Sequence, residues 1–108
     1  MVDYNWEATI IEDDYGKHLE FVLYDEDDEL YNYSPYSSIV CYFKKYQATA
    51  CKIIGACSSV GLGTIRYQLQ STDTDVVGDY YGELKVYSPG AITTWSNIHL
   101  VIKEGVKD

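Results

Sequence analysis

Two sets of closely spaced carboxylates are the residues whose type and spacing could bind a metal ion. Asp25 and Asp27 lie in the uninterrupted acidic run Asp25–Glu29, and Asp73 and Asp75 form a second Asp-x-Asp pair. Calcium takes about six to eight oxygen ligands that converge on one point, commonly in a loop that turns tightly at a glycine. The acidic run has no glycine, so we expect a solvated turn there. Were calcium to bind it, Asp25 and Asp27 would be the ligands.

The thiols and imidazoles lack the spacing of a zinc site. Cys51 and Cys57 are followed by no second cysteine pair, and His18 and His99 each stand alone. Zinc sites use closely spaced Cys or His pairs or an H-E-x-x-H motif. We therefore predict that the chain has neither a metal site nor a cofactor.

No arrangement of residues indicates nucleophilic catalysis, which needs a serine or cysteine beside a base and an orienting group. The chain has only two histidines and no G-x-S-x-G nucleophile elbow. Gly61-Leu62-Gly63 lacks the lysine that follows a phosphate-binding loop. We predict a protein with no catalytic residues. The competing hypothesis, a small hydrolase, requires His18 or His99 within hydrogen-bond reach of a Ser, Cys or carboxylate.

Tyrosine is the residue type that points to binding, because the chain has twelve Tyr against two Phe and two Trp. The candidate contact residues are three in one predicted loop (Tyr31, Tyr33 and Tyr36) and three predicted to face outward from strands (Tyr81, Tyr87 and Trp95). Aromatic side chains concentrate at protein interfaces, where they supply rigid contact area. Three alternatives stay open: a protein contact surface, cross-strand pairing within the chain, and a glycan platform.

The charge balance narrows the class of partner. Seventeen acidic and eight basic side chains give a net charge of −9, whereas phosphate backbones and anionic membranes attract lysine and arginine. We expect neither nucleic acid nor a membrane as a partner. The first residues have no basic and apolar signal-peptide pattern, and no apolar run is long enough to cross a bilayer. The odd cysteine count favours reduced thiols in a protein made in the cytoplasm.

Alternation of apolar and polar residues recurs along the chain, and helical periodicity is not sustained. We expect strands at 5–12, 17–24, 37–46, 50–54, 64–70, 79–87 and 92–103, with a loop at 55–63. The strand at 50–54 is predicted to be a short edge strand with Cys51 and Ile53 facing inward. About seven short strands separated by turn signals predict one all-β domain over residues 1–108, an antiparallel β-sandwich.

Tyr80 indicates the kind of sandwich. A tyrosine near the start of a late strand is typical of a tyrosine corner, in which its hydroxyl ties the entering loop to the immunoglobulin-like sandwich. Secreted immunoglobulin domains usually carry a cysteine two residues later, and this chain has Gly82 there. The pattern therefore predicts an immunoglobulin-like fold without the inter-sheet disulfide.

Several strand motifs support a family resemblance. The early strand Leu19-Glu20-Phe21-Val22-Leu23-Tyr24-Asp25 has the form L-x-F-x-L-x-D, and Gly63-Thr64-Ile65-Arg66-Tyr67 follows the middle loop. Gly78-Asp79-Tyr80-Tyr81-Gly82-Glu83-Leu84 and the alternating Ile98–Ile102 complete the set. Together they resemble the N-terminal immunoglobulin-like domain of bacteriophage baseplate upper proteins. One departure is the turn after the early strand, which is D-E-D-D here instead of D-x-D-G.

This resemblance implies a non-enzymatic structural or assembly module of a phage tail or baseplate. Its partners would be other virion proteins or further copies of the same chain, and its location would be the virion. The alternative function is a carbohydrate-binding β-sandwich module, which would present an exposed platform from Tyr31, Tyr33, Tyr36 or Trp95.

Overall fold

The computed structural model describes residues 5–25, 27–32 and 37–106. These residues contain eight β-strands and no helix. The strands are β1 (Trp6–Ile11), β2 (His18–Val22), β3 (Ser38–Lys45), β4 (Ile53–Ala56), β5 (Ser58–Gly61), β6 (Thr64–Gln68), β7 (Gly78–Ser88) and β8 (Ala91–Lys103). Over these described ranges, no helix is long and apolar enough to span a membrane.

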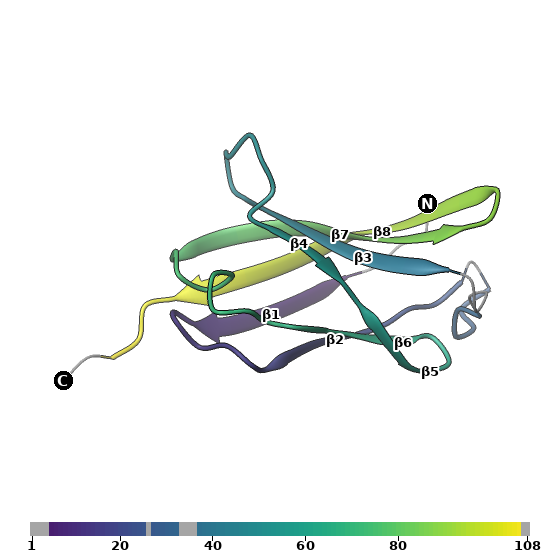
Figure 1. Cartoon of the computed structure of the whole chain (residues 1–108), viewed down its shortest axis with the longest axis horizontal. Helices are drawn as coiled ribbons and strands as arrows, with labels where there is room; N and C mark the ends of the chain where they lie inside the picture. The colour runs from purple at the N-terminus through teal and green to yellow at the C-terminus, as the bar shows by residue number, and fades with distance from the viewer. Residues whose placement is uncertain (1–4, 26, 33–36, 107–108) are drawn as a thin grey trace.

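The strands form two sheets that face each other across the core (Figure 1). The five-stranded sheet has the order β1-β8-β7-β3-β4, and the three-stranded sheet has the order β2-β6-β5. These are the G-F-C and B-E-D neighbours of an immunoglobulin-like sandwich. The predicted all-β sandwich is confirmed. It is not wholly antiparallel, because β1 runs parallel to β8.

The prediction for residues 50–63 was wrong in two respects. The edge strand begins at Ile53 and not at Ala50, so Cys51 lies exposed in the preceding connection and does not face the core. The predicted loop at 55–63 contains the end of β4 and all of β5. Glycine and serine favour loops, but Gly55 has a packing role, because a Cβ there would overlap the ring of Tyr67. The strand therefore needs a glycine where a ring from the opposite sheet approaches.

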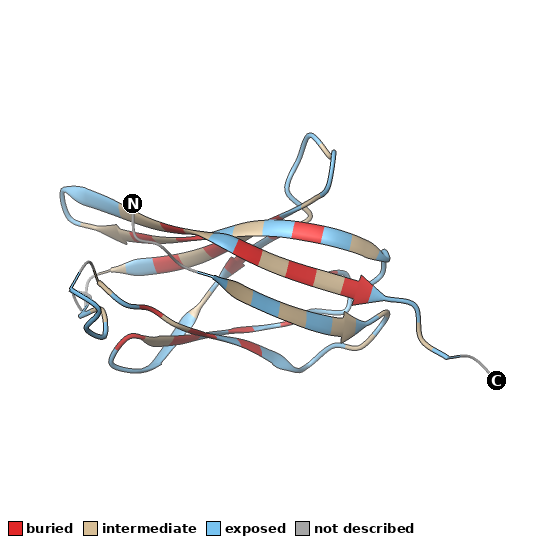
Figure 2. Cartoon of the chain, turned by 180° about the vertical axis from the view of Figure 1, so that it is seen from behind, coloured by how far each residue is buried: buried red, intermediate tan, exposed pale blue. Residues whose placement is uncertain are grey.

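The core follows the predicted alternation along the other strands, and Figure 2 shows buried residues at alternate positions of β8. Its buried side chains come from both sheets: Leu19, Phe21, Leu23, Ile39, Cys41, Phe43, Ile53, Ile65, Tyr67, Leu69, Tyr80, Leu84, Val86, Trp95, Ile98, Leu100 and Ile102. This inner face drives folding through the removal of apolar surface from water.

A phenylalanine ring fills the space beside the position where a secreted immunoglobulin domain has its second cysteine. Phe43 on β3 is paired with Gly82 on β7, and a Cβ on Gly82 would lie 2.7 Å from Cδ1 of Phe43. The three cysteines are free thiols, with Cys41 buried. The Phe43 ring, packed over Gly82, therefore fills this part of the core, which contains no disulfide.

Two tryptophans connect the sheets by hydrogen bonds. The indole N–H of Trp6 on β1 donates to the carbonyl of Glu20 on β2 at 2.9 Å. The indole N–H of Trp95 on β8 donates to the carbonyl of Tyr24, just after β2, at 3.1 Å. The Trp95 ring is fully buried and the Trp6 ring is partly buried, and the polar N–H of each finds a partner.

Buried Asp73 orders the segment between β6 and β7. Its Oδ2 accepts the Tyr67 hydroxyl at 2.5 Å and the backbone N–H of Gln70 at 2.8 Å. Burial and the neighbouring Asp73 carboxylate raise the pKa of Tyr67, which keeps the phenol protonated as a donor. The same tyrosine that requires Gly55 therefore also anchors this loop.

The hydroxyl of Tyr80 makes the hydrogen bond expected of a tyrosine corner. It donates to the carbonyl of Val76, four residues earlier, at 2.6 Å, and the Tyr80 side chain is fully buried. Burial raises the pKa of this phenol, so it is a donor at neutral pH. The loop that enters β7 is thereby fixed to the core.

Removing the Tyr80 hydroxyl tests this tie. Tyr80→Phe keeps the buried ring but leaves the Val76 carbonyl without its donor, so we expect the free energy of unfolding to fall by about 1 kcal/mol. The neighbouring exposed Tyr81→Phe is the matched control and should change stability by less than about 0.5 kcal/mol. Urea unfolding followed by tryptophan fluorescence measures both variants. Equal stability of Tyr80→Phe and the unchanged protein would contradict a structural role for the hydroxyl.

Candidate functional site

The four predicted contact residues that the structure describes do not form one surface. Tyr81 is 51% exposed on the outer face of β7, the face that points away from the three-stranded sheet. Tyr87 is half-buried, and its hydroxyl lies 2.6 Å from the hydroxyl of Tyr42. Tyr31 is half-buried and packs edge-to-face against Trp95, with ring centroids 4.7 Å apart. Tyr33 and Tyr36 lie outside the described residues.

The prediction that Trp95 faces outward was wrong, since its side chain is fully buried. The cause is a β-bulge in β8. Leu84 pairs with Trp95, but Gly82 pairs with Ile98, so β8 has one more residue than β7 over this stretch. Asn97 within the bulge has a φ of 63°. The extra residue reverses the alternation, and Trp95 faces the core together with Ile98.

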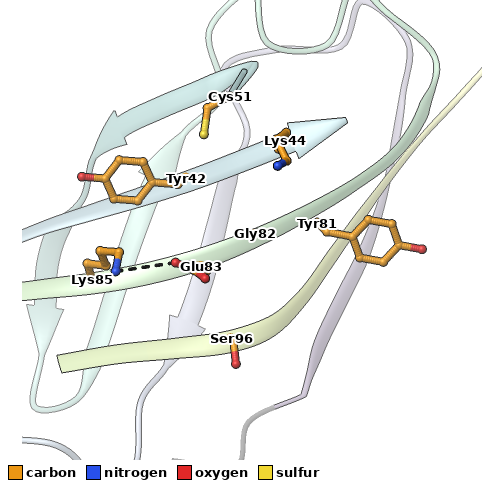
Figure 3. A pocket seen from close by; sticks show the side chains of 8 residues that line it. All are labelled: Tyr42, Lys44, Cys51, Tyr81, Gly82, Glu83, Lys85 and Ser96. Carbon is orange, nitrogen blue, oxygen red and sulfur yellow. Dashed lines mark ion pairs between the residues drawn. The ribbon is translucent and has the colours of Figure 1, made fainter. Parts of the chain in front are cut away.

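A groove of about 440 Å³ lies on the outer face of the five-stranded sheet (Figure 3). Cross-strand pairing places its side chains: Tyr42 on β3 is opposite Glu83 on β7, and Lys44 is opposite Tyr81. The groove is lined by Tyr42, Lys44, Cys51, Tyr81, Gly82, Glu83, Lys85 and Ser96. Of these residues, only Tyr81 is among the contact residues predicted from the sequence.

The groove carries more positive than negative charge on a chain whose net charge is −9. The ammonium of Lys85 lies 3.7 Å from the Glu83 carboxylate and donates to the Thr94 hydroxyl at 3.2 Å. Lys44 adds a second, exposed ammonium at the same face. The groove can therefore accept carboxylates or carbonyl oxygens as well as apolar groups.

Tyr81 is held in a fixed orientation by its neighbours. Its ring stacks on His99 of β8 with centroids 4.8 Å apart and 4° between the planes, and it meets Tyr46 edge-to-face at 6.0 Å. Nε2 of His99 lies 2.9 Å from the Asp79 carboxylate, and Nδ1 lies 3.7 Å from Glu7. A rigid aromatic side chain costs little entropy on binding, so this arrangement suits a contact surface.

The Asp79–His99 pair meets the one condition that the hydrolase hypothesis sets, a histidine within reach of a carboxylate. A second hollow of about 370 Å³ adjoins it, lined by Asn5, Trp6, Glu7, Tyr81, Asn97 and His99. That lining contains no Ser, Thr or Cys side chain that could act as a nucleophile. His18, the other candidate base, is exposed on β2. The pair therefore orients Tyr81, and its hollow lacks the nucleophile of a hydrolytic triad.

The acidic turn uses Asp25 for backbone hydrogen bonds. Oδ1 of Asp25 accepts the backbone N–H groups of Asp27 at 2.8 Å and Glu29 at 3.0 Å. Asp73 accepts from Tyr67, whereas Asp75 pairs with Lys52 at 2.6 Å, so this second Asp-x-Asp pair serves two different partners. In the part of the chain that the structure describes, no three Asp, Glu, His or Cys side chains group as metal ligands do.

No protein-family model matches this sequence, and no curated protein matches it. A function for this chain is therefore inferred from its fold and from the geometry of the outer face.

The three thiols differ in environment, and this difference tests the groove. Cys51 is exposed at its rim, whereas Cys41 is buried and hydrogen-bonded to the partly buried Cys57, which raises the pKa of the Cys41 thiol. We expect Ellman's reagent to modify Cys51 in a fast phase and Cys41 only on unfolding, because the thiolate is the reactive form. Cys51→Ser should remove the fast phase, and Cys41→Ser should retain it. Cys57 is partly buried and its hydrogen bond with Cys41 lowers its pKa, so it can contribute a slower phase. A fast phase of unchanged amplitude in Cys51→Ser would contradict the exposure of Cys51.

Proposed function

We propose that this β-sandwich is a non-enzymatic assembly module that binds other protein molecules through the outer face of its five-stranded sheet. The resemblance to baseplate upper proteins suggests that those molecules are tail or baseplate components and that the module resides in the virion. The proposal needs no cofactor, because the groove supplies apolar, cationic and hydroxyl groups directly.

The observation that carries the proposal is the exposed apolar surface around the groove. Tyr46 is 63% exposed and Ile54 66% exposed, and Tyr81 joins them at 51%. Ile54 lies opposite Tyr42, and Tyr46 packs on Tyr81, so the exposed side chains border one hollow. Soluble monomers seldom expose contiguous apolar patches unless these bind a partner. Aromatic residues with a surrounding polar rim are the usual composition of a protein interface.

A glycan is the second candidate ligand, because Tyr42 and Tyr81 border a groove that also contains amines, a carboxylate and a hydroxyl. Sugar binding on a ring requires a free aromatic face. His99 already covers one face of Tyr81, and the Tyr42 hydroxyl is engaged by Tyr87. With one ring face of Tyr81 and the Tyr42 hydroxyl already engaged within the chain, the groove favours a protein partner over a sugar.

Site-specific photo-crosslinking tests the proposal. Tyr46 and Tyr15 are equally exposed at 63%, but Tyr15 lies in the β1–β2 connection, away from the groove. Each is replaced by p-benzoylphenylalanine in the full chain, expressed in the cells that produce it. We expect a discrete covalent protein adduct from position 46 and none from position 15. Adding Tyr81→Ala should reduce the adduct at position 46, because it removes the adjoining ring.

Equal adduct formation at both positions, or none at position 46, would contradict a contact surface on this face. The same protein applied to a glycan array separates the alternative. Saccharide binding that is lost in Tyr81→Ala, together with no protein adduct, would replace the assembly proposal with a carbohydrate-binding function.

A further inference from the structure

Two of the three cysteines lie beside each other on the inner face of the five-stranded sheet. Cys41 on β3 is opposite Gly55 on β4, and the backbone N–H of Cys57 donates to the carbonyl of Ile39 at 2.8 Å. Cys41 and Cys57 are therefore diagonal neighbours across the two chain segments. Cys41 is buried, and Cys57 is partly buried and packs against the same core.

The two thiols interact directly, and they are not equivalent. The Cys41 thiol donates a hydrogen bond to the Cys57 sulfur, which raises the pKa of Cys41 and lowers the pKa of Cys57. Because the thiolate is the nucleophilic form, Cys57 is the sulfur that reacts first. Its partial exposure gives a small oxidant access, whereas Cys41 is reached only through Cys57.

Cys57 occupies the junction between the two sheets. It is the single residue between β4 of the five-stranded sheet and β5 of the three-stranded sheet. Diagonal neighbours in a ladder are spaced more widely than the two Cα atoms of a disulfide. Cys57 belongs to neither strand, so a shift of this junction toward β3 can bring the sulfurs together. A bond made in this way stores strain, and a strained disulfide is readily reduced.

We propose that Cys41 and Cys57 form a reversible redox site, which a peroxide converts to a disulfide. The Cys57 thiolate attacks one oxygen of hydrogen peroxide and the O–O bond breaks. Cys57 becomes a sulfenic acid, and the departing hydroxide takes up a proton to give water. The Cys41 sulfur then attacks the Cys57 sulfur, the S–O bond breaks, and the hydroxyl leaves as water with the Cys41 proton. Both thiols are thereby oxidised, and one peroxide is reduced to two water molecules.

The site is separate from the proposed contact surface, which lies on the other face of the sheet. A glutathione pool keeps such a pair reduced, so the disulfide forms where peroxide is present or the reducing pool is absent. It links β3 to the junction that leads into β5, and therefore ties together two sheets that no disulfide joins in the reduced chain.

Peptide mapping of the full chain after treatment with hydrogen peroxide tests the site. Trypsin cleaves after lysine and arginine, so the three cysteines fall in three different peptides, 18–44, 46–52 and 53–66. We expect peroxide to link 18–44 to 53–66 with the loss of two hydrogen atoms, and millimolar reduced glutathione to release the link. Cys57→Ser should abolish it. Cys51→Ser is the matched control and should retain it, because Cys51 lines the groove on the outer face.

The peptides that appear decide the outcome. A link that includes 46–52, or sulfinic acid on Cys57 with 18–44 unlinked, would overturn the pairing. A pair that stays reduced while Cys51 is oxidised would also overturn it, and a link that resists glutathione would contradict its reversibility. Circular dichroism checks that each protein is folded when peroxide is added. None of these results bears on the adduct at position 46, by which the outer-face proposal is judged separately.

Discussion

Trp95 donates its indole N–H to the Tyr24 carbonyl across the core, and β8 permits this because it has one residue more than β7 between their paired positions. The bulge turns the largest fully buried side chain inward and places Ser96 at the groove on the other face. Both faces of the five-stranded sheet thus depend on the same extra residue. The hydrogen bonds of Trp95 to Tyr24 and of Trp6 to Glu20 link the two sheets, which no disulfide joins.

Glycines at two positions leave space for aromatic rings in the core. Gly82 accommodates Phe43, and Gly55 accommodates Tyr67, so large rings fill the interior that a cystine occupies in secreted immunoglobulin domains. The tyrosines on the opposite face, Tyr42 and Tyr81, are then oriented by Tyr87 and His99. The outer surface thus presents two oriented aromatic rings, an arrangement that would lower the entropy cost of binding a partner.

Alternation along the chain was enough to predict the sandwich and most of its inward residues, because each side chain's face follows from the two-residue period. It failed at Trp95, where a bulge changes the period, and at residues 55–63, where Gly55 packs against the Tyr67 ring and β5 forms in place of a loop. The groove was not predictable in the same way. Alternation along β3 puts Tyr42 and Lys44 on the outer face, but only the pairing of β3 with β7 brings them beside Tyr81 and Glu83.

The outer face of the five-stranded sheet is the proposed contact surface, and its exposed rings are Tyr46 and Tyr81. The most direct measurement compares amide ¹H–¹⁵N spectra of the labelled chain with and without an unlabelled extract of the cells that produce it. We expect line broadening or shift changes at Tyr46, Ile54, Tyr81 and the outward residues of β3, with the β2 and β6 amides constant. Changes confined to β2 and β6, or identical spectra, would contradict a contact surface on this face.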